Sequence, residues 1–160
     1  MAWTTPKTDW TTGELVAASD LNAIGDNLAA LRNLGKAAYT TTGDIQANPR
    51  DFVKIDSDNL NLTITTTGGD VLVHFHGSIT QENNHAVFLD IEVDGARIGG
   101  ANGTLVNQII WGGRGTEISI LSFTRLVQNL SAGSHTFRLQ WKSASRNTLK
   151  AGAQFWVREI

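Results

Sequence analysis

Residues 70–80 read DVLVHFHGSIT, and this stretch decides the fold class because apolar and polar side chains alternate along it. Successive side chains of a β-strand point to opposite faces, so a period of two places one set on a core and the other outside it. The set predicted to face the core is Val71, Val73, Phe75 and Ile79. The opposite set is Asp70, Leu72, His74, His76 and Ser78. We therefore expect a half-buried strand here.

The same alternation recurs along most of the chain after residue 45. Residues 86–93 alternate in this way, and their acidic side chains together with Asp94 are predicted to form a solvated outer face. These acids are Asp90, Glu92 and Asp94. The Asp94-Gly95 pair predicts a hairpin turn, because glycine accepts a positive φ. Trp141 shares a predicted strand face with Phe137 and Leu139, so we expect it in the core.

Short runs of this kind, separated by Gly, Asn, Asp and Ser, predict seven or eight strands. Their spacing is typical of an antiparallel sandwich, and we expect a mainly β protein with a jelly-roll head over residues 45–160. Other sandwich topologies fit the same spacing. Residues 1–44 are expected to form an N-terminal arm and one short α-helix that precede this head.

The helix is predicted from one apolar stripe near the N-terminus. Ser19 is a candidate N-cap, Asp20 lies in the first turn, and Gly35 marks the end. The stripe recurs at helical spacing and consists of Leu21, Ile24, Leu28 and Leu31. An isolated helix of about 15 residues is marginal in water. The stripe is therefore expected to be buried against a partner.

Composition narrows the function classes. The net charge is −2, which argues against a nucleic-acid-binding protein that needs a strong basic field. The chain has no cysteine, and no apolar run approaches the ~20 residues of a membrane span. The first ten residues, MAWTTPKTDW, do not resemble a signal peptide. We expect no nucleic-acid partner and no membrane insertion.

Two sequence patterns resemble those of small bacteriophage virion proteins. The first has the form W-x-x-G-x-x-V-x-A-S-D-L-N and spans residues 10–22; in proteins of this kind, including tail-fibre and receptor-binding proteins, it precedes a β-domain. The second is LSAGSHTFRLQWK at residues 130–142, together with the terminal VREI at 157–160. It is similar to the last strands of trimeric jelly-roll heads, which share their architecture with complement-type and tumour-necrosis-factor-like domains.

The resemblance implies a homotrimeric structural protein of the virion, assembled in the host cytoplasm and carrying no enzyme activity. Nothing between the two patterns is long enough for an extended fibre shaft, so a short fibre or receptor-binding protein is implied. A capsid decoration protein that stabilises the head is the alternative. Leu21, Ile24, Leu28 and Leu31 fit heptad positions a, d, a and d, so copies can pair through their helices. Packing on the chain's own sandwich or on a different virion protein remains open.

His74 and His76 are the most suggestive residues for metal chemistry. Their spacing of two on a strand projects both imidazoles from one face, where they can share a metal ion. A metal-dependent jelly-roll enzyme is therefore a further alternative, although solvated or interface histidines explain the same pattern. Ser134 and His135 are adjacent in a hairpin, and no nucleophile motif or phosphate loop accompanies them. We expect no catalytic residue and no cofactor.

Tryptophan and arginine supply the remaining binding candidates, since both residue types anchor interfaces and aromatic rings stack on sugars. Trp111 and Arg114 lie in a glycine-rich segment and are candidates for contact with a host surface glycan or receptor. Trp3 and Trp10 lie in the N-terminal arm and are expected to attach the chain to other virion proteins.

Overall fold

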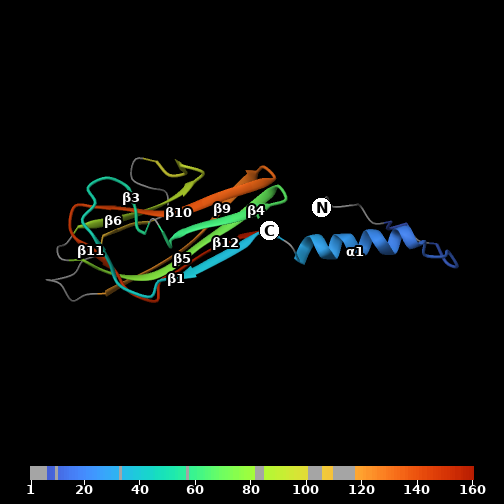
Figure 1. Cartoon of the computed structure of the whole chain (residues 1–160), viewed down its shortest axis with the longest axis horizontal. Coiled ribbons are helices and arrows are strands. Elements are labelled where there is room, and N and C mark those ends of the chain that lie inside the picture. The colour runs from blue at the N-terminus through green and yellow to red at the C-terminus, as the bar shows by residue number, and fades with distance from the viewer. Residues whose placement is uncertain are drawn as a thin grey trace.

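A computed structural model describes residues 7–9, 11–32, 34–56, 58–81, 85–100, 106–109 and 118–160. Within these ranges the chain forms one helix followed by strands. The elements are α1 (Ala18–Arg32), β1 (Lys36–Thr40), β2 (Ile45–Ala47), β3 (Val53–Lys54), β4 (Asn61–Thr66), β5 (Gly69–Gln81), β6 (Ala86–Val93), β7 (Ala96–Arg97), β8 (Val106–Ile109), β9 (Ile118–Leu130), β10 (Gly133–Ser143), β11 (Asn147–Leu149) and β12 (Gln154–Glu159). Figure 1 shows the strands gathered into an elongated sandwich from which α1 projects along the long axis.

The strands form two antiparallel sheets, which we call sheet A and sheet B. In sheet A, β9 pairs with one edge of β5; β12 and then β11 pair with its other edge, and β1 and β2 lie outside them. In sheet B, β10 and β6 are central, with β4 and β3 beside β10 and with β7 and β8 beside β6. The chain changes sheet between β2 and β3, β4 and β5, β5 and β6, β8 and β9, β9 and β10, and β10 and β11. This connectivity is a jelly roll, as the sequence predicts.

The core lies between the two sheets and is built from the inward set of each strand. Val71, Val73, Phe75 and Ile79 of β5 are fully buried, and Trp141 of β10 is buried with them, as predicted. Position 77 also points inward but is occupied by glycine. A Cβ there would lie 2.8 Å from both Phe75 Cζ and Ala153 Cβ, so neighbouring side chains already fill this place.

Helix α1 begins at a different cap from the one expected. The Ala17 carbonyl accepts the first helical hydrogen bond, from Leu21 N at 3.3 Å, so Ala17 and not Ser19 is the N-cap. The Asp20 carboxylate accepts a hydrogen bond from Ala17 N at 3.2 Å. Asp20 therefore supplies the reciprocal half of a capping box from the third helical position. The alanine cap was missed because the side chain that completes it lies one turn further along.

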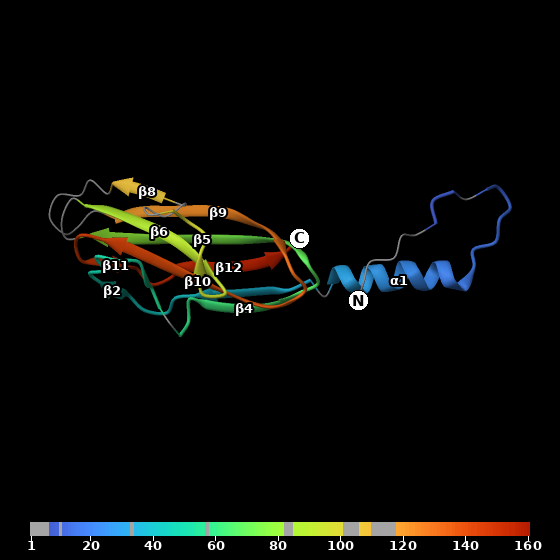
Figure 2. The same cartoon turned by 90° about the horizontal axis from the view of Figure 1, so that it is seen from above.

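Gly35 connects the helix to the sandwich and does not act as a left-handed helix cap. A Cβ at Gly35 would lie 2.3 Å from the Thr65 carbonyl oxygen, so only glycine fits so close to β4. β1 follows at once and pairs with β12 from Lys36↔Arg158 to Thr40↔Gln154. The sandwich therefore includes residues 36–40, which the sequence assigned to the arm that was expected to end at residue 44. Figure 2 shows the same short connection between α1 and β1 from above.

Candidate interaction surfaces

The apolar stripe of α1 is open to solvent in a single chain. Leu21, Ile24 and Leu28 are 59%, 43% and 55% exposed, and the side chain of Leu31 lies outside the described part. Among the described residues, α1 makes no extensive contact with any strand, and Figure 1 shows it standing clear of the sandwich. The alternative in which this stripe packs on the chain's own sandwich is therefore not supported.

The outer face of sheet A carries a second group of exposed apolar side chains. On the edge strand β9, Ile118 and Ile120 are 60% and 65% exposed and Leu126 is also exposed. His74 lies in register between Thr124 and Trp156 and stacks on the Trp156 ring, with centroids 5.0 Å apart. A groove of about 360 Å³ lies beside Trp156 and is lined by residues 36–38 of β1 and 156–158 of β12. We call this surface the sheet A face.

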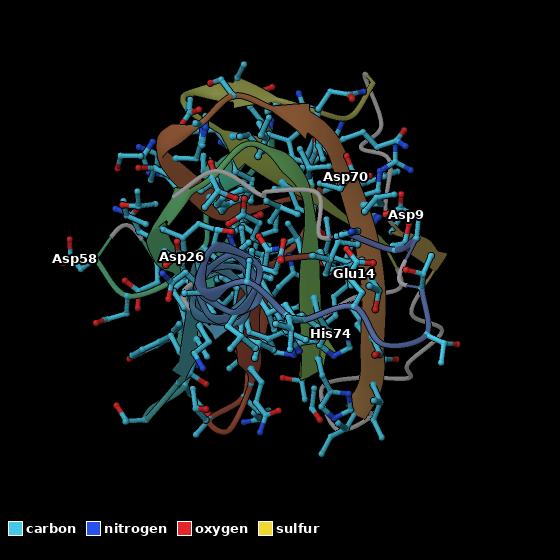
Figure 3. All side chains as sticks on the ribbon, turned by 90° about the vertical axis from the view of Figure 1, so that its right-hand side faces the viewer. Asp9, Glu14, Asp26, Asp58, Asp70 and His74 are labelled. Atoms are coloured by element: carbon cyan, nitrogen blue, oxygen red, sulfur yellow. The ribbon has the colours of Figure 1, made fainter. Side chains whose placement is uncertain are left out.

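The α1 stripe and the sheet A face point to the same side of the molecule. Figure 3 looks along the long axis from the helix end, with Asp26 on the upper left of α1 and His74 below, on the outer side of sheet A. Ile24 and Leu28 each lie two positions from Asp26, about 200° around the helix from it. The stripe therefore faces the lower right, towards the side on which His74 lies. A single symmetry axis that runs parallel to the long axis of the chain can therefore lie beside both the α1 stripe and the sheet A face.

The histidine pair lies outside the core, as predicted, but its two members have different surroundings. His76 is exposed, whereas His74 is partly buried and its Nδ1 lies 2.9 Å from Thr124 Oγ1. Burial lowers the pKa of His74, and the nearby His76 lowers it further. Among the described side chains, no group of three or more His, Asp or Glu residues is placed to hold a metal ion. The pair alone supplies at most two ligands from one chain.

The acidic face predicted on β6 differs from the expectation. Asp90 and Glu92 point outward from sheet B but are buried. The Arg97 Nε donates to Asp90 Oδ2 at 2.7 Å, and Arg138 and Gln140 donate to Glu92. These acids are therefore paired beneath neighbouring segments and are not solvated. The sequence did not reveal this because the covering residues come from other strands.

Asp94 and His135 form a close pair whose geometry is structural. The Asp94 Oδ2 lies 2.7 Å from His135 Nδ1, and His135 Nε2 donates to the Ser131 carbonyl at 2.9 Å. The hydrogen bond with Asp94, followed by that with Ser131, raises the pKa of His135. The bond from His135 in turn lowers the pKa of Asp94. With both ring nitrogens engaged, His135 has no free nitrogen to accept a proton from a nucleophile.

A third surface was not anticipated from the sequence. A recess of about 390 Å³ on the sheet B side is lined by Arg50, Phe88, Lys142, Ser143 and Ala144, and we call it the basic recess. Phe88 and Lys142 face each other in register on β6 and β10. Arg50 comes from a loop about 90 positions earlier in the chain, so no local sequence pattern links it to Lys142.

The four other predicted contact residues lie outside the described residues. These are Trp3 and Trp10 in the arm, and Trp111 and Arg114 between β8 and β9. The adjoining ends of these two strands are placed: Ile109 pairs with Ala86 and Ile118 pairs with Thr80, at the end of the sandwich opposite α1. Within the described ranges, no helix is long and apolar enough to cross a membrane.

No protein-family model matches this sequence, and no curated protein is significantly similar to it. Solved structures do match. A protein of infectious bursal virus derived T=1 particles aligns with 77% of this chain at 10% identity and a TM-score of 0.51. The shared feature is the jelly-roll fold. The aligned region is 31% of the viral chain, so this protein spans about a third of its length. The tumour-necrosis-factor protein Eiger of S. frugiperda aligns over 81% of this chain and 94% of its own, at 12% identity and a TM-score of 0.47.

Proposed function

We propose that this protein is a non-enzymatic structural protein of a bacteriophage virion, which self-associates through the α1 stripe and the sheet A face. The observation that carries the proposal is that both apolar surfaces are exposed in one chain and face the same side. Burying an apolar side chain of this size contributes ~1.5–3 kcal/mol, so leaving several exposed on one side favours association. Three copies is the number that the resemblance to trimeric jelly-roll heads implies.

The arm that precedes α1 attaches the assembly to other virion proteins in this proposal, with Trp3 and Trp10 as anchors. The chain passes from α1 to β1 within residues 33–35, so no shaft separates helix and head. This short connection supports a short fibre or receptor-binding protein, and equally a capsid decoration protein. Deleting residues 1–17 and measuring retention on particles tests the attachment role. Host adsorption by particles that carry Trp111→Ala then separates receptor binding from decoration.

Light scattering after size exclusion tests the self-association directly. We expect a mass three times the 17.3 kDa of one chain. Leu28→Asp adds a charge to the stripe and should shift the protein to monomer. Asn22→Asp adds the same charge on the opposite side of α1, near Asp26, and should leave the trimer intact. A monomeric wild type at micromolar concentration, or equal effects of the two variants, would refute the proposal.

A further inference from the structure

The basic recess is built by a loop that is fixed at both ends. The Pro49 carbonyl accepts a hydrogen bond from Ser143 N at 2.7 Å, which ties the loop to the end of β10. Three residues later, the Phe52 ring lies beneath Arg97, with Cζ 3.7 Å from the ring centroid. Arg50 lies between these two attachments. Its backbone is therefore held beside β10, although it belongs to a loop.

The basic recess contains two cationic side chains, those of Arg50 and Lys142, that can bind an anion. Lys142 Nζ lies 5.0 Å from the ring centroids of both Phe52 and Phe88, so two aromatic rings position its ammonium group. Arg50 is exposed, and no hydrogen bond or ion pair engages its guanidinium group among the described residues. Asp51 is adjacent in sequence but does not line the recess. The described residues that line the recess therefore include two cations and no carboxylate.

The remaining lining suits a compact ring with one apolar face. Phe88 and Ala144 supply apolar surface, while Ser143 supplies a hydroxyl group. A volume of about 390 Å³ lies at the lower end of the ~300–1,000 Å³ typical of ligand sites. A saturated sugar ring has apolar C–H faces that pack on aromatic rings and hydroxyl groups that bond to Ser. An acidic group on that ring would be met by Arg50 and Lys142 through charge-assisted hydrogen bonds.

We propose that the basic recess is a binding site for an acidic sugar residue, with Arg50 and Lys142 binding the acid group and Phe88 packing on the ring. The recess lies at the end of β10 opposite the Gly133 end that faces α1. It belongs to sheet B and includes no residue of the α1 stripe or the sheet A face. Sugar binding is therefore separable from self-association and does not depend on the proposed attachment to a virion.

Three ligands on one glucose frame test the proposal: glucose, glucuronate and glucose 6-phosphate. Amide chemical shifts of the isotope-labelled full chain would be followed by NMR during titration to millimolar ligand at low salt, and repeated at ~150 mM salt. We expect one or both acids to shift the amides of residues 142–144 saturably, and glucose to bind at least tenfold more weakly. The two acids distinguish a carboxylate source from a phosphate ester source.

Two variants complete the experiment. Arg50→Ala should weaken acid binding about tenfold or more, because a hydrogen bond to a charged group is lost. Arg125→Ala removes an exposed arginine from β9 in the other sheet and should not change the affinity. Equal binding of glucose and the acids, no saturable shift with either acid, or an unchanged affinity in Arg50→Ala would overturn the proposal. The mass by light scattering should be the same for Arg50→Ala and wild type, so failure here is distinct from failure of the self-association.

Discussion

Glu159 is the residue whose replacement should most clearly expose how the helix is joined to the sandwich. Its side chain is 1% exposed at the end of β12. Oε1 accepts hydrogen bonds from Thr67 N at 2.7 Å and from Thr67 Oγ1 at 2.8 Å, and Oε2 accepts one from Gly35 N at 3.2 Å. One carboxylate therefore ties the α1–β1 connection to the β4–β5 turn.

The magnitude follows from these three bonds. A hydrogen bond to a charged group contributes ~1.5–3 kcal/mol when its partner is otherwise buried. Thr67 is exposed, so water replaces part of what Glu159→Ala removes, and we expect a loss of about 2–4 kcal/mol in the free energy of unfolding. Glu159→Gln keeps one acceptor oxygen but places an amide group against Gly35 N. It should therefore cost less than alanine, about 1–2 kcal/mol.

Urea unfolding followed by tryptophan fluorescence measures both variants. The protein concentration must be kept constant, because self-association adds stability by mass action. Gln154→Ala changes an exposed residue of the same strand and should stay within ~0.5 kcal/mol of wild type. Amide hydrogen exchange at Gly35 and Thr67 should accelerate in Glu159→Ala. An alanine variant that loses less than ~1 kcal/mol, or a glutamine variant as unstable as alanine, would show that the carboxylate does not hold this junction.

Two further predictions concern the same end of the molecule. The raised pKa of His135 makes its pair with Asp94 stabilising below the ordinary histidine pKa, and this contribution is lost as pH rises through the raised value. The pKa of Asp94 is lowered in the folded protein, so the stabilising contribution of the pair is also lost when the pH falls below the ordinary aspartate range and Asp94 becomes protonated. Wild type should thus lose more stability than His135→Gln between pH 6 and pH 9, as measured by urea unfolding, and parallel profiles would contradict this. Gly35→Ala should cost at least ~2 kcal/mol through its clash with Thr65, whereas Gly43→Ala, with open space around it, should be nearly neutral in the same assay.

The sequence correctly predicted those parts of the fold that depend on residues adjacent in the chain. The period of two in β5 placed Phe75 in the core, and the Asp94-Gly95 pair forms the expected turn, with φ of 51° and 88°. Both angles are positive, as a type I′ hairpin requires. These features depend on neighbouring residues alone, so a single sequence suffices to find them.

Features that depend on distant segments were missed for a physical reason. β1 reads KAAYT, and alanine and lysine are poor strand formers, so only its pairing with β12 makes it a strand. The basic recess likewise requires a loop residue, Arg50, to meet β10. Contacts of this kind between distant segments depend on the topology of the fold, and no periodic pattern in the sequence predicts them. The α1 stripe was predicted because helical spacing is visible in a short stretch of sequence. The surface that covers the stripe was left open because it lies outside that stretch.

The two outer faces of the sandwich differ in a way that bears on how copies can pack. The sheet B side carries Asp90 and Glu92, each already paired with an arginine under neighbouring segments. Packing another chain against this side would bury more charge without supplying new partners, which is costly. The sheet A face carries exposed Ile118 and Ile120 on β9, so covering this part of it removes apolar area from water. An assembly built on these energies places sheet A inward and leaves the basic recess of sheet B accessible from outside.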